Sequence, residues 1–182
     1  MAKDNSIKPF VVDFSGKVLD CHQADCLDEE LIEEIREKAR KGCDLFVFID
    51  TGYSANLDKP FLASDHLNLT GNNPLVGPNN EIGARFPVVN DAYAFADDLL
   101  AAGEGKLSNC DSLAKLETRV GAGLKPGVVP SDEEIALINS LGADFYCYNL
   151  VPATLVAAHA GKKVCAVIMP PKIRPIQRFD SI

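Results

Sequence analysis

A short polar loop that could bind a ligand follows the most apolar run of the chain. The run Cys43 to Ile49 (CDLFVFI) is almost continuously apolar, as expected for a strand buried on both faces. It ends in Asp50-Thr51-Gly52-Tyr53-Ser54. Loops at the carboxyl ends of parallel strands are where α/β folds place ligands. The loop is therefore a candidate site, and a plain turn is an equally good interpretation, because no fuller glycine-rich signature surrounds it.

A cysteine-histidine pattern and a single histidine could also do chemistry, and each has a simpler interpretation. Cys21, His22 and Cys26 form a C-H-x3-C pattern that could supply three ligands to zinc. The rest of the chain adds only His66 and His159 and has no CxxC, so we interpret the pattern as an incidental loop and predict no metal site. We interpret His159 as a helix-capping or core residue rather than a catalytic one.

Composition narrows the class of protein. The chain has 182 residues, 47% of them apolar, which predicts one globular domain with a sizeable core. Its formal charge of -8 argues against a nucleic-acid partner, which needs clustered Lys and Arg. The start MAKDNSIKPF has no apolar signal core and no run of apolar residues is long enough to cross a membrane. We therefore expect a soluble, cytoplasmic protein without a membrane partner, whose six cysteines are reduced.

The first elements predict a strand, a helix and a strand in that order. Phe10 to Phe14 is a β-rich run, and the segment from Asp28 to Gly42 has a capping residue, acids in its first turn, bases in its last and a terminal glycine. The apolar face of this helix consists of Leu31, Ile32, Ile35 and Ala39. The right-handed crossover rule makes the two flanking strands parallel, which predicts an α/β layered domain.

The remaining elements alternate in the same way. Ser131 with Glu134 forms a capping box before a helix that Gly142 ends. The other expected elements, in chain order, are a strand in PFLASDHLNL, a loop over TGNNPLVGPNN, a helix over 91–102, a connector over 103–112, strands over 116–124 and 144–151, a helix over 152–160, a strand over 163–169 and an extended tail over 170–182.

Two blocks of sequence resemble a known family. DHLNLTGNNPLVGPN, followed by IGARFP and NDAY, is similar to the succession RDHINL, GxNPLxGPN, RFPxMSDAYD of the trimeric purine nucleoside phosphorylases. The residues GAD, VP and VAAH between Gly142 and His159 resemble the family's GADAVGMSTVPEVIVARH. The resemblance spans roughly Asp44 to Met169. It implies a three-layer α/β fold with a central mixed, mainly parallel sheet flanked by helices, in one domain over residues 1–182.

The resemblance also implies a reaction and partners. The family cleaves purine nucleosides with inorganic phosphate and releases the base and ribose 1-phosphate, so the expected chemistry is pentosyl transfer, with phosphate as co-substrate and no other cofactor. The expected partners are a small nucleoside, purine or phosphate and further copies of the same chain, most simply as a trimer. Phosphate must be held by amides and basic or hydroxyl side chains while the purine receives a proton or hydrogen bond.

The resemblance assigns candidate substrate- and phosphate-binding residues at the positions that match the family's motifs. The loop Asp50, Thr51 and Gly52 falls where the family has its Asn-Ala-Ala-Gly-Gly phosphate and base loop. Phe86 matches the aromatic residue lent to the neighbouring subunit's ribose site, and Tyr148 and Asn149 fall where Met and Ser contact ribose and phosphate. His66, in the DHLNL motif, is a further candidate for an altered role. No catalytic residue follows from these matches.

Other positions depart from the family pattern. The purine-anchoring Glu of GPSFET falls near Val129 and Pro130, and the Asn of ITNK falls at Pro170 or Pro171. The GSGLG phosphate loop has no equivalent ahead of Phe10, and the family's C-terminal helix has none either. Three interpretations stay open: a phosphorylase or nucleoside hydrolase, a non-catalytic binding or regulatory module, and a chain whose site another chain completes.

Overall fold

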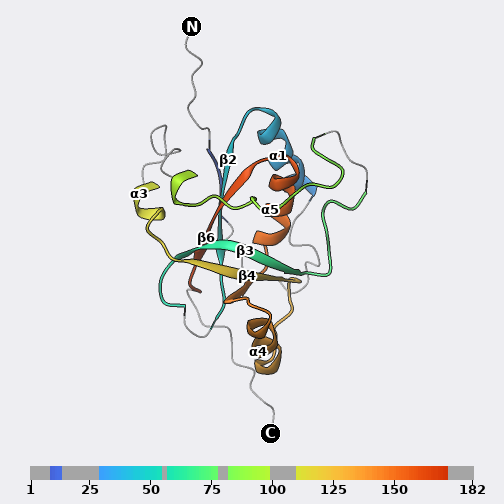
Figure 1. Cartoon of the computed structure of the whole chain (residues 1–182). Helices are drawn as coiled ribbons and strands as arrows, with labels where there is room; N and C mark the ends of the chain where they lie inside the picture. The colour runs from blue at the N-terminus through green and yellow to red at the C-terminus, as the bar shows by residue number, and fades with distance from the viewer. Residues whose placement is uncertain (1–8, 14–28, 55–56, 78–81, 99–109, 172–182) are drawn as a thin grey trace.

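A six-stranded mixed sheet forms the centre of the molecule (Figure 1). The computed structural model describes residues 9–13, 29–54, 57–77, 82–98 and 110–171. The strand order is β1-β2-β6-β3-β4-β5, and of the five neighbouring pairs only β3 and β6 are antiparallel. The strands are β1 (Pro9–Asp13), β2 (Leu45–Thr51), β3 (Phe61–Leu69), β4 (Thr118–Leu124), β5 (Phe145–Cys147) and β6 (Lys163–Met169). The predicted α/β class with a mainly parallel sheet is confirmed.

The predicted strand-helix-strand unit is present at the start of the sheet. Strands β1 and β2 pair in parallel, and α1 (Glu29–Arg40) connects them. Ile35 and Ala39 of its predicted apolar face are buried, while Leu31 and Ile32 pack at the edge of the same core. Gly42 ends the helix with a φ of 84°, a left-handed conformation that a glycine adopts without strain. The capping residue proposed for this helix, Asp28, lies outside the described residues.

Helix α5 (Leu150–His159) is the central helix of the core. Every residue in it except Leu155 is buried, as expected for a helix that is apolar all round. It lies beside α1 on one side of the sheet (Figure 1) and contacts β2, β3, β4 and β6. The helix begins two residues before the predicted start at Pro152, and β5 ends at Cys147, four residues before the predicted end of that strand. His159 is 7% exposed, which confirms the core interpretation.

The predicted start of the helix over 91–102 is wrong. Val164 of β6 accepts a hydrogen bond from Ala94 N and donates one to Ala92 O, both at 2.8 Å. This bridge extends the sheet, so the chain becomes helical only at residue 96, and residues 99–109 lie outside the described part. The expected connector also contains the start of a short helix, α3 (Cys110–Leu113).

The sheet curves until its two sides meet. Tyr53, just after β2, forms an antiparallel bridge with Tyr146 of β5, with N to O distances of 2.9 and 3.0 Å in the two directions. Strands β2 and β5 are second and sixth in the sheet order, so this contact closes the sheet toward a barrel. A side chain at Gly52 would place its Cβ only 2.4 Å from Ile168 Cγ2. The close approach therefore requires glycine at this position.

The expectations for cysteines, membrane spans and metal ligands can be compared with the structure only over the described residues. Cys43, Cys147 and Cys165 are buried. Among the residues that the structure describes, no helix combines the length and apolar character needed to cross a membrane. The Cys21, His22, Cys26 pattern and the tail beyond Pro171 fall outside the described residues.

Helix α4 (Asp132–Ser140) begins with the predicted capping box, and this contact can be tested. Ser131 Oγ accepts a hydrogen bond from Glu134 N at 3.3 Å, and Glu134 Oε2 accepts one from Ser131 N at 2.7 Å. We expect Ser131→Ala to lower the free energy of unfolding by about 1 kcal/mol in urea titrations. Ser140→Ala is the control, because the Ser140 hydroxyl only bonds back to Leu137 O within the helix. Equal losses in the two variants would contradict the capping role of Ser131.

Candidate functional site

The carboxylate of Asp50 connects the end of β2 to the start of α5. It is 2% exposed and accepts four hydrogen bonds. Oδ1 accepts from Thr51 N at 2.8 Å and Asn149 Nδ2 at 3.2 Å, and Oδ2 accepts from Asn149 N at 3.0 Å and Leu150 N at 2.9 Å. Asp50 therefore caps α5 from a position 100 residues earlier in the chain. This cap accounts for the early start of the helix.

The environment of Asp50 combines an unfavourable and a favourable effect on its charge. The pKa of the Asp50 carboxyl is raised, because the effect of burial exceeds that of the hydrogen bonds from Asn149, Thr51 and Leu150, which lower it. All four donors are N–H groups, and two of them are backbone amides at the positive end of the α5 dipole. Since a proton on either oxygen would compete with one of these donors, the arrangement fits the ionised carboxylate.

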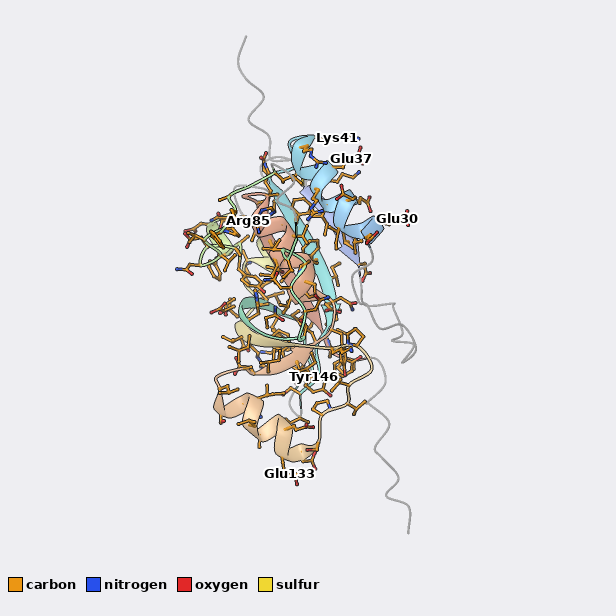
Figure 2. All side chains as sticks on the ribbon, turned by 90° about the vertical axis from the view of Figure 1, so that its right-hand side faces the viewer. Glu30, Glu37, Lys41, Arg85, Glu133 and Tyr146 are labelled. Atoms are coloured by element: carbon orange, nitrogen blue, oxygen red, sulfur yellow. The ribbon has the colours of Figure 1, made fainter. Side chains whose placement is uncertain are left out.

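Three tyrosines form a cluster beside the loop that follows β2. The rings of Tyr53 and Tyr146 stack with centroids 5.3 Å apart, and Tyr148 meets both edge-on at 5.7 and 6.0 Å. The Tyr148 hydroxyl donates to Val128 O at 2.7 Å. Figure 2 shows Tyr146 beside α4, whose Ile138 belongs to the same apolar cluster. Burial raises the pKa of all three hydroxyls, so they stay protonated at neutral pH.

The structure brings together only part of the predicted site. Asp50 and Thr51 lie next to Asn149, whereas Gly52 donates to Met169 O and approaches Ile168. Tyr148 packs against Tyr53 in the tyrosine cluster. His66 instead faces Tyr93, and Phe86 lies on the surface with 88% of its area exposed. Sequence reasoning missed Tyr53 and Tyr146 as a pair, because nothing local indicates that residues so far apart in the chain will meet.

The positions that correspond to the family's purine contacts offer no hydrogen-bonding side chain. Pro130 is buried and Val129 is 55% exposed. Asp132 and Glu133, the nearest acids, are exposed in the first turn of α4, as a simple helix start predicts. Pro170 and Pro171 follow directly after β6. Proline lacks an N–H, so these residues cannot donate to a purine.

The described surface also has a hollow that sequence reasoning treated only as a loop. It has a volume of about 390 Å³ and lies after the end of β3, lined by Asn68, Gly71, Asn72, Asn73 and Val76. The Thr70 hydroxyl organises this turn, donating to Asn68 Oδ1 at 2.6 Å and accepting from Asn72 N at 3.0 Å. Within the described ranges, no cluster of three or more His, Cys, Asp or Glu side chains could hold a metal ion.

No family model matches the chain, but the chain is similar to individual proteins of known family. It is 35% identical over 112 residues to purine nucleoside phosphorylase 1 of Bacillus subtilis. The aligned region covers 58% of this chain and 38% of that protein. The chain is 31% identical over 141 residues to the purine nucleoside phosphorylase of Mycobacterium tuberculosis, covering 75% of this chain and 47% of the relative.

Solved structures agree with these relatives. Isoform 2 of purine nucleoside phosphorylase from Schistosoma mansoni, in complex with cytosine and ribose-1-phosphate, superposes with a TM-score of 0.64 at 28% identity, covering 78% of this chain and 52% of that one. A Schistosoma purine nucleoside phosphorylase in complex with guanosine has a TM-score of 0.63 at 25% identity, with coverage of 76% and 52%.

The mixed sheet and the flanking helices define an α/β protein of the nucleoside phosphorylase type. The relatives and the solved structures support a divergent member of the purine nucleoside phosphorylase family. The chain spans less than half the length of these curated relatives.

His66 has a second polar contact away from Asp50. Its Nδ1 lies 2.8 Å from the hydroxyl of Tyr93, which is 4% exposed. Burial lowers the pKa of His66, an effect that Asp65 partly opposes, and burial raises the pKa of Tyr93. Neutral His66 therefore accepts at Nδ1 from the protonated Tyr93 hydroxyl. This contact joins His66 of β3 to Tyr93, the residue that bridges to β6.

The lowered pKa of His66 predicts a pH-dependent stability. The unfolded chain binds a proton near pH 6.5 and the folded chain only at lower pH, so the contribution of His66 is complete above about 6.5 and is lost as pH falls. We expect urea unfolding between pH 7.5 and 5.5 to show a slope that His66→Gln reduces by up to about 1.4 kcal/mol per pH unit. Tyr93→Phe keeps the buried imidazole and should keep the slope. An unchanged slope in His66→Gln would refute this assignment.

Proposed function

We propose that this chain is a purine nucleoside phosphorylase-like protein that keeps the family scaffold without catalysing phosphorolysis on its own. The observation that carries this proposal is the pairing of Asp50 with the first amides of α5. The resemblance places a phosphate and ribose contact at Asn149, and that residue already gives both its backbone and its side-chain N–H to Asp50. Phosphate at this position would lie beside a buried negative charge, which repels it.

The neighbouring residues support the same conclusion for the sugar and the base. Tyr148 stands where the resemblance expects a side chain against ribose, yet its ring packs in the tyrosine cluster and its hydroxyl bonds to Val128 O. The base positions hold Val129, Pro130, Pro170 and Pro171, which supply no side-chain donor or acceptor. Hydrogen bonds lost at such positions cost a reaction on the order of 10²-fold each.

A second candidate function is binding of a purine, a nucleoside or phosphate without turnover. The hollow at Asn68, Asn72 and Asn73 favours it, because the amides of Asn72 and Asn73 stand at an open surface next to an apolar Val76. Amide groups beside an apolar wall are the chemistry that small polar ring compounds need. The site would then differ from the one the family resemblance assigns.

We also propose that the chain forms a homo-oligomer, with a trimer as the expected state, and that it works in the cytoplasm. Large apolar side chains of the segment before α3 are unusually exposed: Val76 at 81%, Phe86 at 88% and Val88 at 81%. Apolar surface of this kind normally marks an interaction site. The six cysteines, scattered along the sequence without the spacing of a secreted disulfide scaffold, support a reducing compartment.

The proposed lack of turnover predicts the outcome of an activity assay. The purified chain is incubated with inosine, guanosine or adenosine, with and without phosphate, and released base is separated by chromatography. We expect no release above the blank, while purine nucleoside phosphorylase 1 of Bacillus subtilis, run in parallel, releases base. Thermal shifts with the same compounds test binding without turnover, since a ligand of the native state raises its melting temperature. Phosphate-dependent base release by the lone chain would overturn the proposal.

The proposed oligomer predicts a mass in solution. Light scattering should give about three times the chain mass of 19.6 kDa, and Phe86→Asp should lower the mass toward a single chain. Leu137→Asp is the matched control, because Leu137 is also exposed, at 59%, but lies on the outer part of α4. A wild-type mass of 19.6 kDa would sink the proposal.

A further inference from the structure

Four N–H groups surround the carboxylate of Asp50 and form what we call the oxyanion seat. The seat consists of the backbone amides of Thr51, Asn149 and Leu150 and the side-chain Nδ2 of Asn149, at 2.8 to 3.2 Å from the two oxygens. Each oxygen accepts two of these hydrogen bonds, so all lone pairs in the carboxylate plane are used. The side-chain amide of Asn149 makes no cap bond within its own helix. Its orientation is therefore set by the anion.

The charge in the seat is stabilised by dipoles rather than by a cation. None of the ion pairs between described residues includes Asp50, and the hydrogen bonds that lower its pKa come from N–H groups of Asn149, Thr51 and Leu150. The ten-residue helix α5 directs its positive end at the carboxylate. Converging backbone amides at a helix N-terminus are the usual way in which proteins hold small anions. The seat thus has the properties of an anion site that the chain fills itself.

We propose that Asp50 is an internal anion that occupies a small-carboxylate site at the start of α5, and that the site binds an external carboxylate such as formate once the Asp50 side chain is shortened. This inference rests on the proposed function, since it explains how the native chain excludes phosphate from Asn149. The seat is closed to solvent, because Asp50 is 2% exposed. Only an anion of the size of the removed group fits, which selects formate over the larger tetrahedral phosphate.

The test is chemical rescue of Asp50→Ala, which removes a carboxylate of the size of formate. Melting temperatures of the wild type and the variant are compared in sodium chloride, formate and phosphate at matched ionic strength. We expect Asp50→Ala to melt below the wild type in chloride and to recover part of the difference in formate with a saturable dependence on concentration. Wild type gives the general effect of each salt on stability, and rescue is the gain of Asp50→Ala in formate beyond the gain of the wild type.

Two further variants separate occupation of the seat from general salt effects. Asp50→Asn fills the same volume with a neutral amide, so it should be destabilised without responding to formate. Asp144→Ala removes an exposed carboxylate that accepts a hydrogen bond from Val120 N at 2.9 Å, and formate should not rescue it, because solvent already reaches that amide. Equal formate responses of the wild type, Asp144→Ala and Asp50→Ala would overturn the proposal.

If Asp50→Ala fails to fold in chloride, its refolding yield replaces the melting temperature as the measured quantity. Its refolding yield in formate, followed by circular dichroism and gel filtration, should then exceed the yield in chloride several-fold, and equal yields would overturn the proposal. Failure of rescue leaves the nucleoside assay unaffected, and base release by wild type leaves the rescue unaffected. The two proposals can therefore fail separately.

Discussion

The hydrogen bonds between the Asp50 carboxylate and the first amides of α5 are the constraint on which the other features depend. Burying an ionised carboxyl is costly unless its oxygens are fully bonded, and here four N–H donors satisfy them. In return the carboxylate caps the most buried helix of the molecule. Because Asp50 lies at the end of β2, the same contact determines where the helix begins and how it lies against the sheet.

The closure of the sheet follows from this contact. With β2 tied to the start of α5, Gly52 passes close to Ile168, and Tyr53 can pair with Tyr146 of β5. The ring of Tyr148 then completes an apolar cluster that also includes residues of β4 and α4. The bridge and the cluster together hold the two sides of the sheet against each other.

A shared fold tolerates sequence change more readily than a small anion site does. The scaffold depends on many apolar contacts, such as those of β2, β6 and α5, each of which tolerates conservative change. Binding a small anion depends on a few donors at fixed positions, and one carboxylate at Asp50 is enough to occupy them. This difference explains how a chain about one third identical to phosphorylases can share their fold while a carboxylate of its own occupies the donors at the start of α5.

The sequence by itself determined the elements whose signals are local. The amphipathic pattern of α1, the capping box of α4 and the apolar run of β6 all involve residues within a few positions, and the family motifs correctly indicated the fold. Only the tertiary structure decided the role of Asp50, the stacking of Tyr53 on Tyr146 and the bridge of Ala92 and Ala94 to Val164. These contacts join segments far apart in the chain. Their partners become neighbours only when the sheet has closed, so neither composition nor periodicity carries any trace of them.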